Sequence, residues 1–143
     1  MNRLKAIVEA VISRLKGIDG GENYNYSLSG GQVLSGYIGH DQANQYPCVC
    51  VIGASLDGSS FIDQRSRNIP FTVELLGYVC HEQDVLAEAL KLASDIETAL
   101  FADETFGGLV WDLSARLEVS AMNASSYGGV FIEIKGMTMK NRL

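Results

Sequence analysis

The stretch from Glu82 to Ala102 constrains the fold more than any other, because it has the pattern of a long amphipathic helix. Its polar positions recur at alternating spacings of four and three and are Asp84, Glu88, Lys91, Asp95 and Thr98. The opposite side is apolar and consists of Val85, Leu86, Ala89, Leu90, Ala93, Ile96 and Leu100. The pattern predicts one solvated face and one buried face, so this helix needs a sheet or another helix to pack against.

A second amphipathic helix is predicted over residues 4–15, where apolar side chains recur at helical spacing. The run Cys48–Ile52 is apolar on both sides, which is typical of a strand covered on two faces. Alternating apolar residues predict further strands within residues 66–79, 111–120 and 130–139. In the strand predicted within residues 111–120, the side expected to face the core, called the dry side, consists of Trp111, Leu113, Ala115, Leu117 and Val119.

These elements predict a single α+β domain over residues 1–143, with two helices on one face of a mainly antiparallel or mixed sheet of about four strands. The last two strands are expected to pair as an antiparallel hairpin. In the polar segment Gly20–Tyr46, strand-like alternation of side chains is seen before and after the pair Gly30-Gly31. This pattern predicts a protruding hairpin. Few aliphatic residues accompany Tyr24, Tyr26 and Tyr37 in this segment. The hairpin is therefore expected either to project toward a neighbouring molecule or to lie flat on its own sheet.

Composition and charge narrow the classes of partner. The chain has 11 Lys and Arg against 17 Asp and Glu, so 11 − 17 gives a net charge of −6, which argues against clamping a nucleic-acid backbone. No apolar run approaches the roughly 20 residues that span a bilayer, and no signal-type leader is seen. We therefore expect Cys48, Cys50 and Cys80 to be reduced, with the first two buried on one face of a strand.

The motifs that would indicate catalysis or a cofactor are incomplete. Gly31–Gly36 has the glycine spacing of a phosphate-binding loop, but Tyr37 stands where the lysine is required. His81 precedes a glutamate as in zinc-protease helices, but the second histidine is missing. The other histidine, His40, lies in a polar segment beside an aspartate, where solvation alone accounts for it. The sequence therefore predicts no enzyme, no cofactor and no metal site.

Three runs of the chain resemble the tail terminator proteins of tailed bacteriophages, also called tail completion or minor tail proteins. They are Ile69–Tyr78, Leu92–Leu100 and Asp103–Val110. The Pro-led strand Tyr46–Val49 and the order of elements are similar to that family too. The resemblance implies a structural virion protein, made in the cytoplasm of a bacterial host. Six copies would form a ring that caps the head-proximal end of the tail tube, stops its growth, offers a docking surface to a neck or head-completion protein, and lets DNA pass without specific binding.

Three surfaces are predicted to carry such contacts. The first is the wet sheet face, with Glu74, Asp112, Arg116, Glu118 and Glu133, which we expect to meet the lumen or the next subunit. The second is the tyrosine segment, with Tyr24, Tyr26 and Tyr37. The third is a long connection from Gly53 to Arg67, whose Phe61, Arg65 and Arg67 are expected to dock on the tube or on a neighbouring copy.

Two alternatives remain open at the level of sequence. The chain is also compatible with another phage structural part, such as a head-tail joining protein or a tube protein, which a similar α+β core would serve. A small ligand-binding domain or enzyme would instead require a deep pocket lined by His40 or His81 and a monomer in solution.

Overall fold

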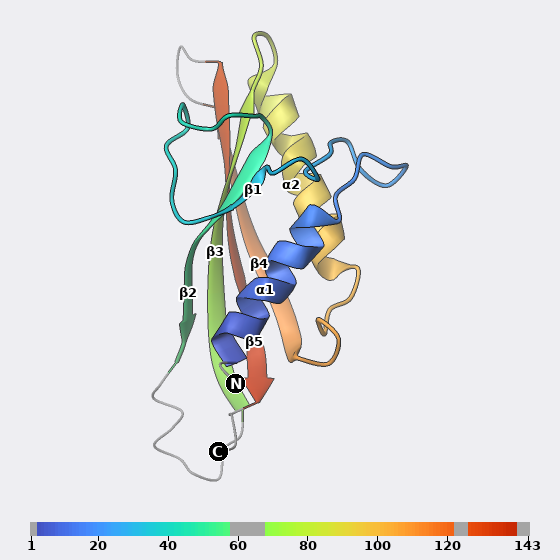
Figure 1. Ribbon diagram of the computed structural model, residues 1–143, viewed down its shortest axis with the longest axis vertical. Helices are drawn as coiled ribbons and strands as arrows, with labels where there is room; N and C mark the ends of the chain where they lie inside the picture. The colour runs from blue at the N-terminus through green and yellow to red at the C-terminus, as the bar shows by residue number, and fades with distance from the viewer. Residues whose placement is uncertain (1–2, 58–67, 122–125, 140–143) are drawn as a thin grey trace.

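The protein is described by a computed structural model that places residues 3–57, 68–121 and 126–139 (Figure 1). The elements in chain order are α1 (Arg3–Lys16), β1 (Val33–Ser35), β2 (Cys48–Leu56), β3 (Asn68–Cys80), α2 (Val85–Phe101), β4 (Val110–Ala121) and β5 (Tyr127–Met139). The predicted α+β class is confirmed, with two helices and a mixed sheet. The sheet has five strands rather than about four, because the short strand β1, predicted as part of the protruding hairpin, joins the sheet beside β2.

The strand order is β1-β2-β3-β5-β4. β1 runs parallel to β2, and every other neighbouring pair is antiparallel, including the predicted pairing of β4 with β5. β2 extends to Leu56, so it includes the start of the segment predicted to be a long connection. The rest of that prediction, residues 58–67, lies outside the described residues.

Both helices cover the same face of the sheet, as predicted (Figure 1). Each helix buries a stripe of apolar residues spaced three and four apart, which is why these segments are helical. The stripes are Ile7, Val11 and Leu15 on α1 and Leu92, Ile96 and Leu100 on α2. They pack on the alternate residues of the sheet, among them Val73, Leu75, Ile132 and Ile134.

The solvent-facing side of α2 differs from the prediction. Asp95, expected on the solvated face, is only 1% exposed, because Asn25 and Tyr26 cross α2 at this point. Leu86 and Leu90, expected on the buried face, are 45% and 53% exposed. The helix itself begins later than predicted, after the N-cap Asp84, whose carboxylate accepts a hydrogen bond from the Ala87 N–H at 3.3 Å.

The predicted hairpin in residues 20–46 is wrong. Its first limb does not pair with its second: Leu28 instead donates its N–H to the Ile18 carbonyl, and the chain around Tyr26 lies on α2. Its second limb contains β1, which adds to β2 in parallel, with Val33 opposite Val49. The first limb therefore belongs to the helix layer and the second to the sheet.

The second face of the sheet is only partly covered. Cys48 and Cys50 of β2 are buried there together with Tyr78, beneath apolar residues of the 36–47 segment. Tyr78 donates its hydroxyl hydrogen to the Ile38 carbonyl at 2.9 Å, which ties this segment to the sheet. The prediction that β2 is covered on both faces is therefore confirmed for its first half.

A β-bulge near the start of β4 changes which side chains face the core. Two residues of β4, Asp112 and Leu113, stand opposite Gly136, and Asp112 has a left-handed φ of 53°. Residues on either side of a bulge fall out of step by one position, so Trp111 lies beside Met137 on the uncovered face while Leu113 packs on the core. The prediction that Trp111 belongs to the dry side is therefore wrong.

Candidate functional site

The candidate site is the uncovered part of the second sheet face, which we call the open face. Here β3, β5 and β4 present every second residue to solvent, because their other residues are committed to the helix-covered core. The side chains of the open face include Ser55, Thr72, Glu74, Ser114, Arg116, Glu118, Glu133 and Lys135. The predicted residues Glu74, Arg116, Glu118 and Glu133 are therefore brought together on one surface.

Charges on the open face form short pairs along the strands. Arg116 Nη1 lies 2.5 Å from Glu118 Oε1, and Lys135 Nζ lies 3.5 Å from Glu133 Oε1. The Arg116 guanidinium also lies 5.9 Å from the centre of the Phe131 ring. Since Arg116 and Glu118 are both more than half exposed, their pair contributes at most about 1 kcal/mol to stability. These residues define the chemistry of a surface rather than the stability of the fold.

Asp112, the fifth predicted residue of this face, lies at its end. With Ser55, Thr72, Lys135 and Met137 it lines a hollow of about 440 Å³. The left-handed backbone at Asp112 is what turns this residue away from the regular alternation of β4. The open face thus ends in a hollow lined by both polar and apolar residues, and the β4 bulge forms one side of it.

The three predicted tyrosines do not form one surface. Tyr26 is half-buried on α2, where its hydroxyl donates to the Glu88 carboxylate and its N–H donates to Asp95 at 2.8 Å. Burial and then the Glu88 hydrogen bond raise the pKa of Tyr26, and the same bond is the main cause of the lowered pKa of Glu88. Tyr24 packs against the same helix-covered core. These two residues attach the segment to its own domain.

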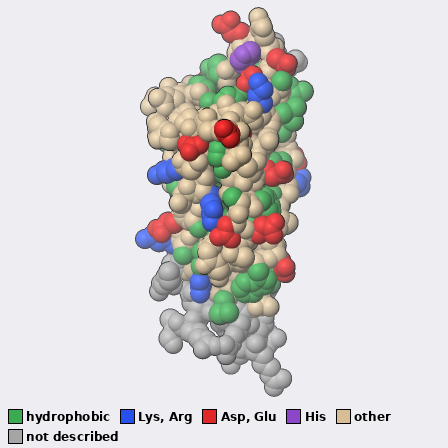
Figure 2. Space-filling view, turned by 90° about the vertical axis from the view of Figure 1, so that its right-hand side faces the viewer, with side chains coloured by type: hydrophobic (Ala, Val, Ile, Leu, Met, Phe, Trp, Pro, Cys, Tyr) green, Lys and Arg blue, Asp and Glu red, His purple; other side chains and the backbone are tan. Residues whose placement is uncertain are grey.

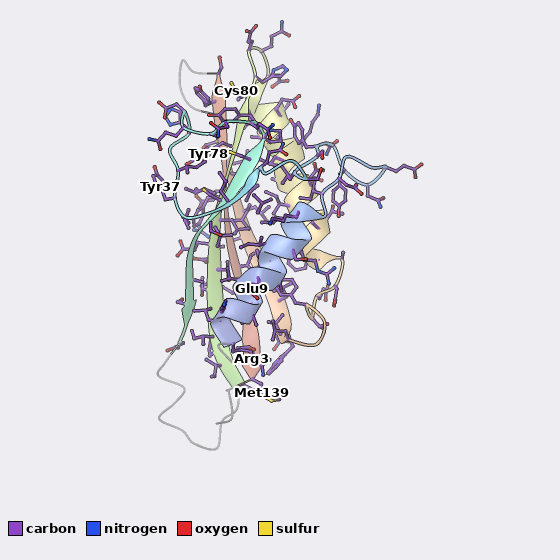
Figure 3. The ribbon with its side chains drawn as sticks, viewed as in Figure 1. Arg3, Glu9, Tyr37, Tyr78, Cys80 and Met139 are labelled. Carbon is purple, nitrogen blue, oxygen red and sulfur yellow. The ribbon has the colours of Figure 1, made fainter. Side chains whose placement is uncertain are left out.

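Tyr37 lies elsewhere and is 70% exposed. It neighbours Tyr78 on the second sheet face, and Figure 3 shows it at the margin of the molecule, away from α2. Burial, followed by the nearby Cys50 and Tyr37, raises the pKa of Tyr78 to about 12. The remaining predicted contacts, Phe61, Arg65 and Arg67, lie outside the described residues.

The two histidines and Cys48 make structural contacts in the described part of the chain. His81 Nδ1 accepts hydrogen bonds from the N–H groups of Gln83 and Asp84, at 3.3 and 3.2 Å, so it orders the turn before α2. The His40 ring packs edge-on against Tyr127, 5.0 Å away between ring centres. Burial raises the pKa of the Cys48 thiol to about 11, which keeps it protonated and unreactive near neutral pH.

Two further hollows on the described surface are lined without either histidine. One of about 500 Å³ lies between the helices beside Arg14 and Tyr24, and one of about 340 Å³ lies beside Leu34. Among residues 3–57, 68–121 and 126–139, no three His, Cys, Asp or Glu side chains gather closely enough to hold a metal ion.

Sequence reasoning missed two residues that matter for these surfaces. Lys135 belongs to the open face, and its alternation with Ile134 was a signal that pointed to it. Asp95 positions the Tyr24–Tyr26 segment, and no local pattern revealed this because its partners lie about 70 positions away.

Neither described helix is long and apolar enough to cross a membrane. A scan of the sequence against known protein families finds no match, and a search among curated proteins finds none either.

Proposed function

We propose that this chain is a structural subunit that assembles with copies of itself into a ring, and that the ring is the terminator of a bacteriophage tail tube. The observation that carries the proposal is the open face: a solvated sheet surface of mixed charge that brings Glu74, Arg116 and Glu133 into one row across three strands. Surfaces of this kind suit protein contacts better than small-molecule chemistry. The resemblance in the β3, α2 and post-α2 segments adds the phage assignment.

The charge of the chain is compatible with a passage for DNA. Its net charge is −6, and Figure 2 shows acidic and basic side chains interspersed over one side of the molecule without a broad basic patch. An acidic lining repels phosphates, so the duplex slides, whereas a basic lining would hold it with salt-dependent affinity. In this proposal the partners are further copies of the chain, the tube protein and a neck or head-completion protein.

The test is to polymerise tail tubes with and without the purified chain and to image them by negative-stain electron microscopy. We expect tubes of fixed length with a ring at one end in its presence, and overgrown tubes in its absence. Long polymers formed by the chain alone would instead identify it as a tube protein. Tubes whose length and ends do not respond to the chain would contradict the terminator proposal.

A further inference from the structure

One margin of the sheet is formed by β4. β4 is the last strand, and the described residues provide no strand beyond it. Exposed edges in monomeric proteins are normally blocked by proline, by a bulge or by a charge that points inward. The only irregularity of β4 lies before Ser114, and from there to Ala121 its core-facing side chains are apolar: Ala115, Leu117 and Val119. This stretch is suited to pairing with another strand.

Among the residues that the structure places, nothing pairs with the outer side of the second half of β2, which forms the opposite margin. β1 covers only residues 49–51 of that strand. Beyond the bulge at Gly53, the N–H of Asp57 donates inward to the Pro70 carbonyl at 2.9 Å. Because backbone groups alternate along a strand, those of Leu56 and Ala54 point outward, away from β3. Figure 1 shows the lower part of β2 at the margin of the sheet, with no described strand beside it.

We propose that a second copy of this chain occupies the β4 edge, and that its β2 edge makes the contact, so that the sheet continues from one copy to the next. The directions of the strands permit this. β2, β3, β5 and β4 alternate in direction, so β2 and β4 are antiparallel. In a ring whose copies all point the same way along the axis, β4 of one copy therefore meets β2 of the next in the antiparallel sense. This inference rests on the proposed ring and names its contact.

Charges at the two margins are complementary. Gly53, Glu74, Glu133 and Arg116 lie in one row across the sheet. The Glu74 carboxylate lies over Gly53, 3.6 Å from where a Cβ on that glycine would be, and so leans toward the β2 margin. Within the described part of the chain, no cation lies within ion-pair distance of Glu74, and Arg116 stands at the β4 margin. In the continued sheet, Arg116 reaches Glu74 of the next copy across the side-chain-free Gly53.

A charge swap tests this contact. We expect Glu74→Arg and Arg116→Glu each to weaken self-association at least about tenfold, because each places like charges face to face. The double variant restores an opposite pair and recovers association. Glu97→Arg, on the exposed surface of α2, is the matched control and leaves association unchanged. Sedimentation measures association, and thermal unfolding checks that each variant folds. The contact would be overturned if the two single variants associate like the wild type, or if the double variant does not regain association.

Disulfide trapping tests the alignment of the edges independently. Ser55, Thr72, Lys135 and Ser114 form one row on the open face, so Ser114 of one copy should lie beside Ser55 of the next. Neighbouring antiparallel residues have Cα atoms about 4.5–5.5 Å apart, within the range of a disulfide. In a Cys80→Ser background, which removes the exposed thiol, Ser55→Cys with Ser114→Cys should give a ladder of linked chains on oxidation.

Ser120→Cys with Ser55→Cys is the control, because Ser120 lies six positions further along β4, roughly 20 Å away. Links between two copies of Ser114→Cys alone, or a wild-type chain that stays monomeric both alone and with tail tubes, would overturn the inference. One outcome is that rings cap tubes while neither the charge-swap variants nor the disulfide trapping gives the expected result. In that case the proposed contact is wrong and the terminator role stands. If the ladder forms but tube length does not respond, the contact stands and the terminator role fails.

Discussion

At the scale of single residues, Asp95 joins parts of the chain that are distant in sequence. Its buried carboxylate accepts hydrogen bonds from the backbone N–H groups of Asn25 and Tyr26, both at 2.8 Å, and from Asn25 Nδ2 at 3.0 Å. Hydrogen bonds to a charged acceptor are stronger than neutral ones, and a buried donor that loses its acceptor is destabilising. Asp95 therefore holds the segment between α1 and β1 against α2.

Replacing Asp95 by Ala should lower the free energy of unfolding by about 1–3 kcal/mol, because it leaves the part-buried N–H groups of Asn25 and Tyr26 without their acceptor. Urea denaturation measures this change. Glu97→Ala, two positions further on and exposed, is the matched control and should change stability by less than about 0.5 kcal/mol. Equal effects of the two substitutions would show that the Asp95 hydrogen bonds do not stabilise the fold.

Asp103 should make stability depend on pH. Its carboxylate accepts hydrogen bonds from the Thr105 hydroxyl and N–H and from the Gly107 N–H, with Arg14 at 3.0 Å, and these contacts lower its pKa to about 2. The unfolded chain binds the proton at about pH 3.9. The stabilisation is therefore complete above that pH and is lost as the pH falls through about 2.

We expect the wild type to be more stable than Asp103→Asn at pH 6 and the difference to shrink as the pH is lowered toward 2. Chemical denaturation at a series of pH values measures both proteins, and their other carboxylates cancel in the comparison. A difference that stays constant from pH 6 to pH 2 would contradict this role of Asp103.

At the scale of elements, β3 and β5 pack closely where Gly136 stands beneath Phe71. A Cβ on Gly136 would lie 2.8 Å from Phe71 Cε1 and 3.0 Å from the Trp111 carbonyl oxygen. The same glycine stands opposite the bulge of β4, so one small residue serves both the aromatic packing and the irregular pairing. The β-strand alternation continues through it because the neighbouring positions keep their normal faces.

Gly136→Ala should therefore lower the free energy of unfolding by about 1–3 kcal/mol, because the added methyl group overpacks the site. Gly53→Ala is the matched control: it is also a strand glycine, but its Cβ would meet only Glu74 at an ordinary contact distance of 3.6 Å. Thermal unfolding of the two variants measures the contrast. A destabilisation of Gly53→Ala equal to that of Gly136→Ala would contradict the packing argument.

At the scale of the whole molecule, the acidic net charge predicts weak attraction to nucleic acids. We expect no binding of duplex DNA by the isolated chain near 150 mM salt, because its net charge is −6. Replacing Glu118 and Glu133 by Lys changes the net charge by +4, to −2, and gathers cations on the open face. Fluorescence anisotropy should then detect weak, salt-sensitive binding by the variant only. Binding by the wild type would contradict a passage through which DNA slides.

The periodicity of the chain by itself determined the class of the fold. Helical spacing in the two helix segments and alternation in the later strands indicate which side of each element is apolar. Apolar sides of helices and sheets can be buried against one another in only a few layered arrangements. The same alternation placed Glu74, Arg116, Glu118 and Glu133 on one face. These are local properties, carried by residues a few positions apart.

The tertiary structure decided what depends on distant partners. Asp95 is buried only because the Asn25–Tyr26 chain crosses it, and Tyr37 is separated from Tyr26 because their two limbs bind different layers. Trp111 changed faces because one bulge shifts the alternation by a single residue. In each case the deciding contact joins segments from different parts of the chain, and no pattern within one segment encodes which partner it will meet.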